Sequence, residues 1–214
     1  MATAQKSRLT CLPLESGDRL TRVEFERRYA TRPDIKKAEL VEGVVYVASP
    51  VRTEEHGTPH FNATTWLGVY VARTPGIIPA SDATVRLDND NEFQPDIYLA
   101  WDHEHGGAAT LDDDGYLTGA PDLVVEIAAS SASYDLGQKM NVYRRNGVRE
   151  YVVWQILEER IDWFELSEGT YAPIAPDGEG VVGSRVFPGL RLNVPAMLRG
   201  DLAAVLDSLR PPIS

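Results

Sequence analysis

Cysteine is almost absent from the sequence: Cys11 is the single one among 214 residues. One cysteine excludes an internal disulfide and a zinc site built from cysteines. Long apolar runs are also missing, since no segment reaches the roughly 18 apolar residues needed to cross a membrane. The first residues lack the charged-then-apolar pattern of a secretory signal, and no Walker, dinucleotide-binding or Gly-x-Ser-x-Gly motif is present. We therefore expect a cytoplasmic protein without a membrane span.

Positive charge is scarce as well, with 21 Lys and Arg residues against 32 Asp and Glu residues and a net charge of −11. A polyanion repels DNA at long range, which argues against a protein that coats DNA non-specifically. This charge does not exclude an enzyme that combines a local basic face with a bound divalent cation. The segment from Arg22 to Lys37 is the best candidate for such a face, because it has six basic residues against three acidic ones. The alternative, an ordinary solvated helix face, is favoured by the pattern.

The composition, with 43% hydrophobic residues, suits one well-packed domain. We expect an irregular segment over residues 1–18 and a single domain over residues 19–214. Thr21 and Glu24 form a capping-box pattern, which predicts a helix as far as about Tyr29.

The next part of the chain alternates between strand and helix patterns. The stretch AELVEGVVYVAS predicts a hairpin with Glu42-Gly43 at its turn, and spaced apolar residues predict a helix over about residues 55–73. The stretches IIPA, TVRL and QPDIYLAW predict further strands. Residues 102–119 are rich in Gly and Asp and predict a loop or a hairpin.

The C-terminal half contains a strand, a helix and a second strand in succession. DLVVEIA is a short apolar run typical of a buried strand, Asn146-Gly147 predicts a helix end, and EYVVWQI is the next strand, so the two strands should be parallel neighbours. RIDWFEL, GTYAPIA and SRVFPGLRLNV predict antiparallel additions, and one helix is predicted from Pro195 to Leu209. The fold class is therefore α/β, a mixed sheet flanked by helices.

Glu126 stands out because every neighbour in Leu-Val-Val-Glu-Ile-Ala prefers to be buried. A buried carboxylate costs several kcal/mol unless it is paired or bound to a metal. Side chains alternate along a strand, so Val124, Glu126 and Ala128 should share one face. Two explanations remain open from the residues alone: Glu126 pairs with a buried arginine or caps a turn, or it belongs to a functional site.

Asp96 and Lys139 add to the second explanation. Asp96 follows Pro95 at the start of another extended segment, and two carboxylates on adjacent strands offer the oxygen ligands that Mg²⁺ accepts. Lys139 lies four residues after Asp135 on the predicted helix, at the edge of its core-facing side. The alternative for Lys139 is an ordinary surface ion pair with Asp135.

Together these motifs resemble a known family. The stretch GAPDLVVEIAASSASYDLGQKMNVYRRNGVREYVVW, with AELVEGVVYVASP, the His of EEHG and QPDIYLAW upstream, resembles the Uma-two family of restriction endonuclease-like proteins, which belongs to the PD-(D/E)XK nuclease superfamily. The resemblance covers about residues 38–166 and implies a restriction-endonuclease-like core. His56 matches a family position where helix packing is favoured over substrate contact.

The resemblance also implies roles for particular residues. Asp96 and Glu126 would be ligands of Mg²⁺, with Mn²⁺ as a substitute, and the backbone carbonyl of Ile127 would add a third ligand. The superfamily's lysine normally stands two residues after the acidic position, where this chain has Ala128, and Lys139 matches the lysine that has moved to the following helix. Glu39 matches the acidic residue of the first motif, which supports the metal or its water.

The expected function is hydrolysis of phosphodiester bonds in DNA by a metal-dependent endonuclease. The alternative is a nuclease fold that serves as a non-catalytic binding or regulatory module, which the negative charge favours. Lys139→Ala is expected to abolish cleavage while leaving the fold intact. Nucleases of this fold often pair as C₂ homodimers to cut both strands, but no residue distinguishes a dimer from a monomer, or DNA from RNA as substrate.

Overall fold

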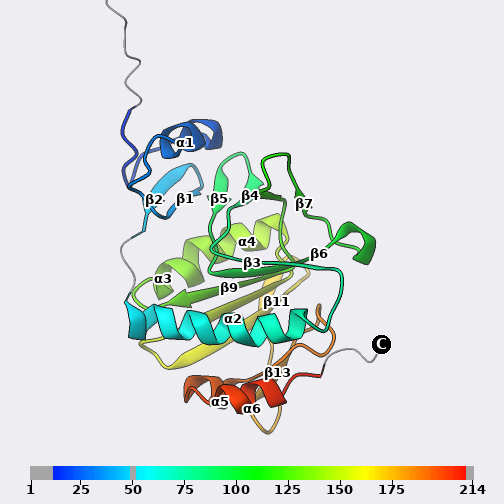
Figure 1. Ribbon diagram of the computed structural model, residues 1–214. Coiled ribbons are helices and arrows are strands. Elements are labelled where there is room, and N and C mark those ends of the chain that lie inside the picture. The colour runs from blue at the N-terminus through cyan, green and yellow to red at the C-terminus, as the bar shows by residue number, and fades with distance from the viewer. Residues whose placement is uncertain (1–11, 49–51, 211–214) are drawn as a thin grey trace, which may run out of the picture.

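Two six-stranded sheets organise the computed structural model, which describes residues 12–48 and 52–210 (Figure 1). The first sheet has the order β2 (Val44–Val47), β1 (Ala38–Val41), β5 (Asn91–Phe93), β4 (Val85–Asp88), β8 (Leu117–Thr118), β7 (Thr110–Leu111). The second has the order β12 (Thr170–Pro173), β11 (Arg160–Ser167), β10 (Glu150–Gln155), β9 (Leu123–Ala128), β6 (Ile97–Trp101), β3 (Ile77–Ser81). A two-stranded sheet pairs β13 (Val181–Gly183) with β14 (Arg191–Asn193).

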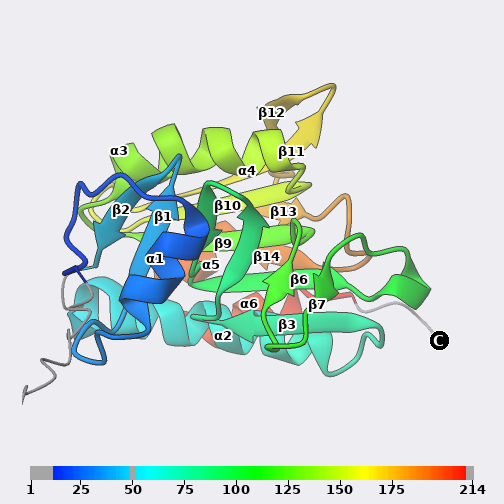
Figure 2. The same ribbon diagram turned by 90° about the horizontal axis from the view of Figure 1, so that it is seen from above.

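Helices cover both faces of the second sheet (Figure 2). The helices are α1 (Arg22–Tyr29), α2 (Thr58–Val71), α3 (Ala132–Tyr134), α4 (Met140–Asn146), α5 (Val194–Leu198) and α6 (Leu202–Asp207), with π turns η1 (Thr53–Gly57) and η3 (Asp135–Lys139) and the 3₁₀ turn η2 (His103–His105). Among them, α1 packs against β1 and β2 of the first sheet. One core joins α2, α5 and α6 to one face of the second sheet, and another joins α4 and the first sheet to its other face. None of the helices in the described ranges combines the length and the hydropathy of a membrane span.

The predicted strand–helix–strand unit is confirmed at the centre of the second sheet. β9 and β10 are parallel and in register, with Val125 opposite Val152, and all six residues of each strand are buried. Val124 and Ala128 belong to the core on the α4 side, whereas Val125 belongs to the core on the α2 side. Glu126 therefore shares a face with Val124 and Ala128, as predicted, and this face is the one that packs against α4.

The N-terminal predictions are also confirmed in the described residues. Thr21 caps α1 by accepting from the Glu24 N–H, and β1 and β2 form a hairpin. Glu42 and Gly43 both have positive φ, 51° and 72°, as a two-residue hairpin turn requires. Residues 12–18 contain no helix or strand, yet Leu14 packs into the core beneath α1. The remainder of the predicted irregular segment lies outside the described residues.

Two parts of the architecture differ from the sequence prediction. The α/β class holds, but the expected single sheet is divided, because β1, β5 and β4 pair with one another and not with β6 or β9. The expected C-terminal helix is two helices. Gly200 adopts φ +74° after α5, and Asp201 starts α6 by accepting from the Ala204 N–H, so the chain changes direction between them.

Candidate active site

Antiparallel pairing of β6 and β9 brings Asp96 and Glu126 to the same end of the second sheet. Ile97 lies opposite Val125, so Asp96, one residue before β6, reaches the part of β9 beyond this pair. The Ile127 N–H donates to Asp96 Oδ2 at 2.7 Å. Asp96 and Glu126 are each 3% exposed, so both carboxylates are buried at this end.

Lys139, at the end of η3, reaches Glu126 and two further carboxylates. This turn is wide, since the Met140 N–H reaches the Asp135 carbonyl five residues back. Lys139 Nζ lies 2.7 Å from Glu126 Oε1, 3.2 Å from Glu39 Oε1 and 3.7 Å from Asp135 Oδ1. The surface ion pair considered for Lys139 and Asp135 is therefore wrong: the pair exists, but both side chains are buried.

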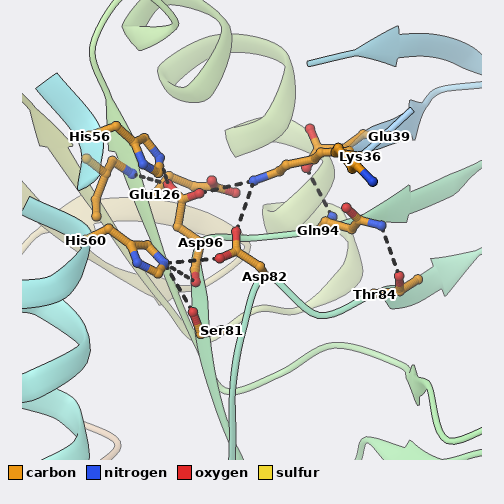
Figure 3. A network of polar contacts seen from close by, with 12 residues as sticks. Lys36, Glu39, His56, His60, Ser81, Asp82, Thr84, Gln94, Asp96 and Glu126 are labelled. Carbon is orange, nitrogen blue, oxygen red and sulfur yellow. Dashed lines mark hydrogen bonds and ion pairs between the residues drawn. The ribbon is translucent and has the colours of Figure 1, made fainter. Parts of the chain in front are cut away.

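Further contacts fix the carboxylates around Lys139. Glu39, on β1, also accepts from the Gln94 N–H at 3.1 Å, and Figure 3 shows these two residues side by side. The Tyr143 hydroxyl donates to Glu126 Oε1 at 2.8 Å. A buried arginine or a turn cap was the alternative explanation for Glu126. Its partners are instead a buried lysine and a tyrosine.

Asp96 has a second set of partners that the sequence did not assign to it. Lys37 Nζ lies 3.1 Å from Asp96 Oδ1, and His56 Nε2 lies 3.3 Å from Asp96 Oδ2. His60 Nε2 lies 3.1 Å from the Asp96 carbonyl oxygen and 3.5 Å from Asp82 Oδ2. Figure 3 shows both histidines, from η1 and α2, directed toward Asp96. His56 therefore faces the site, whereas helix packing was favoured from the sequence.

The two carboxylates at the sheet end have pKa values displaced in opposite directions. Burial raises the pKa of Glu126 to about 8, although the Lys139 ammonium opposes the shift. Burial acts in the same sense on Asp96, but the His56 hydrogen bond and the Lys37 charge outweigh it and hold the pKa of Asp96 well below its ordinary value. Displacement of neighbouring carboxyl pKa values in opposite senses is a common property of active sites.

These groups open into a cavity of 720 Å³. Its lining includes Lys37, Glu39, His56, Asp96, Glu126, Ile127, Asp135 and Lys139. The Tyr134 side chain also lines this cavity, and its hydroxyl is buried without a hydrogen-bond partner among the described residues. An unpaired buried hydroxyl is costly, so a molecule in the cavity that accepts its hydrogen bond would be favoured.

The cavity can accommodate a hard divalent cation. The lining has five carboxylates and three cationic side chains, which leaves an excess of −2 when all are ionised and His56 is neutral: Glu39, Glu55, Asp96, Glu126 and Asp135 against Lys37, Arg52 and Lys139. Because N–H and C=O of a strand residue point to the same side, the Ile127 carbonyl is directed to the edge where its N–H meets Asp96. In residues 12–48 and 52–210, no three Asp, Glu, His or Cys side chains converge as a metal cluster. Mg²⁺ ordinarily takes one or two carboxylates plus waters and substrate phosphates, so this donor set fits it.

The basic segment before β1 is mostly neutralised by its own acids. Arg28 lies 2.6 Å from Glu24, and Arg32 lies 2.8 Å from Asp34. These ion pairs therefore agree with the interpretation of this segment as a solvated helix face, except at Lys37. The sequence contained a signal for the position of Lys37. Lys37 is two residues before Glu39, so in an extended chain both side chains point to the same side.

Comparison with known proteins adds an independent observation. Residues 22–195 match the family model Uma2, described as "Putative restriction endonuclease". A crystal structure described as "a putative nuclease belonging to DUF820 from Anabaena variabilis ATCC 29413" is similar, with a TM-score of 0.61 and 13% identity over 81% of this chain and 96% of that one. At this identity the likeness shows a shared fold, and no curated protein matches the chain. Since the family model spans most of the sequence, including every residue of the cavity discussed above, the chain belongs to the Uma2 family.

Proposed function

We propose that the protein is a metal-dependent endonuclease that hydrolyses phosphodiester bonds in DNA, with Mg²⁺ as its cofactor and Mn²⁺ as a substitute. The observation that carries the proposal is the meeting of Asp96, Glu126 and Lys139 in one cavity, although they come from three separate parts of the chain. Burying this many charges near a sheet end costs stability, which a purely structural role does not require. Membership of the Uma2 family supports the same assignment.

Asp96 and Glu126 would hold the cation together with the Ile127 carbonyl. Lys139 and Tyr143 both contact Oε1 of Glu126, so Oε2 is the oxygen that Glu126 would offer. When bound, the cation would polarise the phosphate and lower the pKa of a water molecule.

Lys139 would act on the phosphate or on the attacking water. Its ammonium is fixed by Glu39 and Asp135, so it needs little rearrangement to stabilise negative charge that develops next to Glu126. Glu39 acts through Lys139 in this scheme and is a positioning residue. The wide turn η3 matters here, because it turns both Asp135 and Lys139 inward.

Metal dependence is the direct test of the proposal. We expect calorimetry to detect Mg²⁺ and Mn²⁺ binding at or below millimolar concentration, and supercoiled plasmid to be cleaved with either ion and left intact in EDTA. Nicked product would indicate one cutting site at a time, whereas linear product would favour a C₂ homodimer. Absence of metal binding and of cleavage would favour the non-catalytic module, which the net charge of −11 also supports.

Tyr134→Phe provides a test of substrate contact in the cavity. If the unpaired hydroxyl binds a substrate oxygen, its removal should raise the Michaelis constant for DNA by about 3- to 10-fold, which corresponds to about 1 kcal/mol for one hydrogen bond. The melting temperature should not fall, because no protein hydrogen bond is lost.

Tyr171→Phe is the matched control for this variant. Its hydroxyl donates to the Val148 carbonyl at 2.8 Å, away from the cavity, so its removal should lower the melting temperature without changing the Michaelis constant. If Tyr134→Phe behaved like Tyr171→Phe, the hydroxyl would have a structural role.

A further inference from the structure

The cavity contains two lysines that are held very differently. The Lys139 side chain is 4% exposed and lies within 3.7 Å of three carboxylates. The Lys37 side chain is 27% exposed, and its contacts are with Asp96 Oδ1 at 3.1 Å and Asp82 Oδ1 at 3.8 Å. Lys139 is thus fixed, whereas Lys37 has room to change partner.

Lys37 forms an ion pair with Asp96, a carboxylate that the proposed cation needs as a ligand. Oδ2 of Asp96 already accepts from the Ile127 N–H and lies beside His56, and Oδ1 is next to Lys37. An ammonium and a divalent cation on one carboxylate repel each other strongly in a buried site. Binding of the cation therefore favours a Lys37 side chain that has moved away from Asp96.

We propose that Lys37 is a displaceable counter-ion: it neutralises Asp96 before the cation binds and afterwards contacts a phosphate oxygen of the DNA. This inference rests on the proposed function. Lys37 lines the cavity on a flexible four-carbon stem, so its ammonium can reach a phosphate bound there. The arginines before it, such as Arg28 and Arg32, are already paired with neighbouring acids. Lys37 is thus the member of the basic segment that is placed to meet substrate.

The test compares Lys37→Met with Lys36→Met. Lys36 is the adjacent, exposed lysine, and its Nζ contacts the Pro33 carbonyl, outside the cavity. Calorimetry with Mn²⁺ and no DNA should show at least about 3-fold tighter binding for Lys37→Met, because the competing ammonium is gone. The Michaelis constant for plasmid cleavage should rise, and its log–log dependence on salt should lose about 0.9 in slope, the value expected for one phosphate contact. Lys36→Met should leave Mn²⁺ binding and this slope unchanged, and Lys37→Arg should restore the slope.

Other results of these measurements would contradict different parts of the proposal. Equal or weaker Mn²⁺ binding by Lys37→Met, with normal binding by the wild-type protein, would overturn the counter-ion role. Tighter Mn²⁺ binding with an unchanged salt slope would overturn the phosphate contact and indicate that Lys37 moves to Asp82. A wild-type protein that binds no Mn²⁺ and cuts no DNA would instead overturn the proposed function itself. Circular dichroism of each variant confirms that the comparison is made on folded protein.

Discussion

Replacement of Glu126 by glutamine should reduce DNA cleavage by at least about 100-fold, equivalent to about 2.7 kcal/mol of transition-state stabilisation. Glutamine has nearly the same shape but cannot supply the negative charge that a divalent cation needs. The fold should survive, because burial already raises the pKa of Glu126 to about 8 and a neutral side chain suits this position. Lys139 would keep Glu39 and Asp135 as partners. Single-turnover cleavage would measure the loss of rate, and calorimetry with Mn²⁺ would measure the loss of metal affinity.

Glu150→Gln is a suitable control for this experiment. Glu150 is a fully buried carboxylate on β10, the strand next to β9, but it accepts from Ser184, Trp163 and the backbone N–H of Arg185, away from the cavity. Its replacement should lower stability and leave cleavage per folded molecule unchanged. If cleavage survived Glu126→Gln or Glu126→Ala, the assignment of Glu126 to metal binding would be wrong.

The sequence was sufficient to place Glu126, and the reason is local. Its burial follows from apolar neighbours, and its direction follows from strand alternation, which needs no knowledge of the rest of the fold. The parallel pairing of β9 and β10 followed from the length of the helix between them. The hairpin at Glu42-Gly43 followed from its turn residues. The break in the C-terminal helix was missed, although Gly200-Asp201 combines a helix-ending residue with a helix-starting one.

The surroundings of Asp96 could not be predicted in this way, because they depend on contacts between distant segments. Lys37 and Asp96 are 59 residues apart, and Lys139 and Glu39 are 100 residues apart. The depth of Lys139 depends on the π turn η3, which changes the direction of side chains relative to a regular helix. A regular helix period therefore predicted Lys139 at the edge of the core-facing side of the helix, whereas its side chain is buried.

The negative net charge is compatible with a site of this kind. The cavity carries an excess of −2 when its carboxylates are ionised, so it attracts a cation before it attracts a phosphate. A bound divalent ion would cancel this excess, so the cavity would no longer repel a phosphate of DNA. Such a protein would bind DNA weakly without metal, and its affinity would be concentrated at the cavity.

Replacement of Lys139 by alanine should abolish cleavage and also destabilise the fold by about 3–5 kcal/mol, the usual cost of removing one partner from a buried ion pair. The sequence suggested that this variant would leave the fold intact. The structure argues otherwise, because Glu39, Glu126 and Asp135 would all lose their common cation while remaining buried. Urea unfolding would measure the change, with Lys36→Ala as a surface control that should shift stability by less than about 0.5 kcal/mol.

The loss of folding stability caused by Lys139→Ala should depend on pH. Without Lys139, the pKa of Glu126 would rise beyond its present value of about 8, since the ammonium lowers it. A carboxyl whose pKa is higher in the folded state than in the unfolded state binds its proton more tightly when folded, so its contribution to stability is lost as pH rises above the unfolded value of 4.5. Lys139→Ala should therefore be less destabilised near pH 5 than near pH 8.

The double variant Glu39→Gln/Lys139→Met removes one charge of each sign, so it should recover part of the lost stability while cleavage stays absent. That outcome would separate the contribution of Lys139 to catalysis from its contribution to folding, whereas a double variant as unstable as Lys139→Ala would show that the cost lies in lost packing and not in unpaired charge.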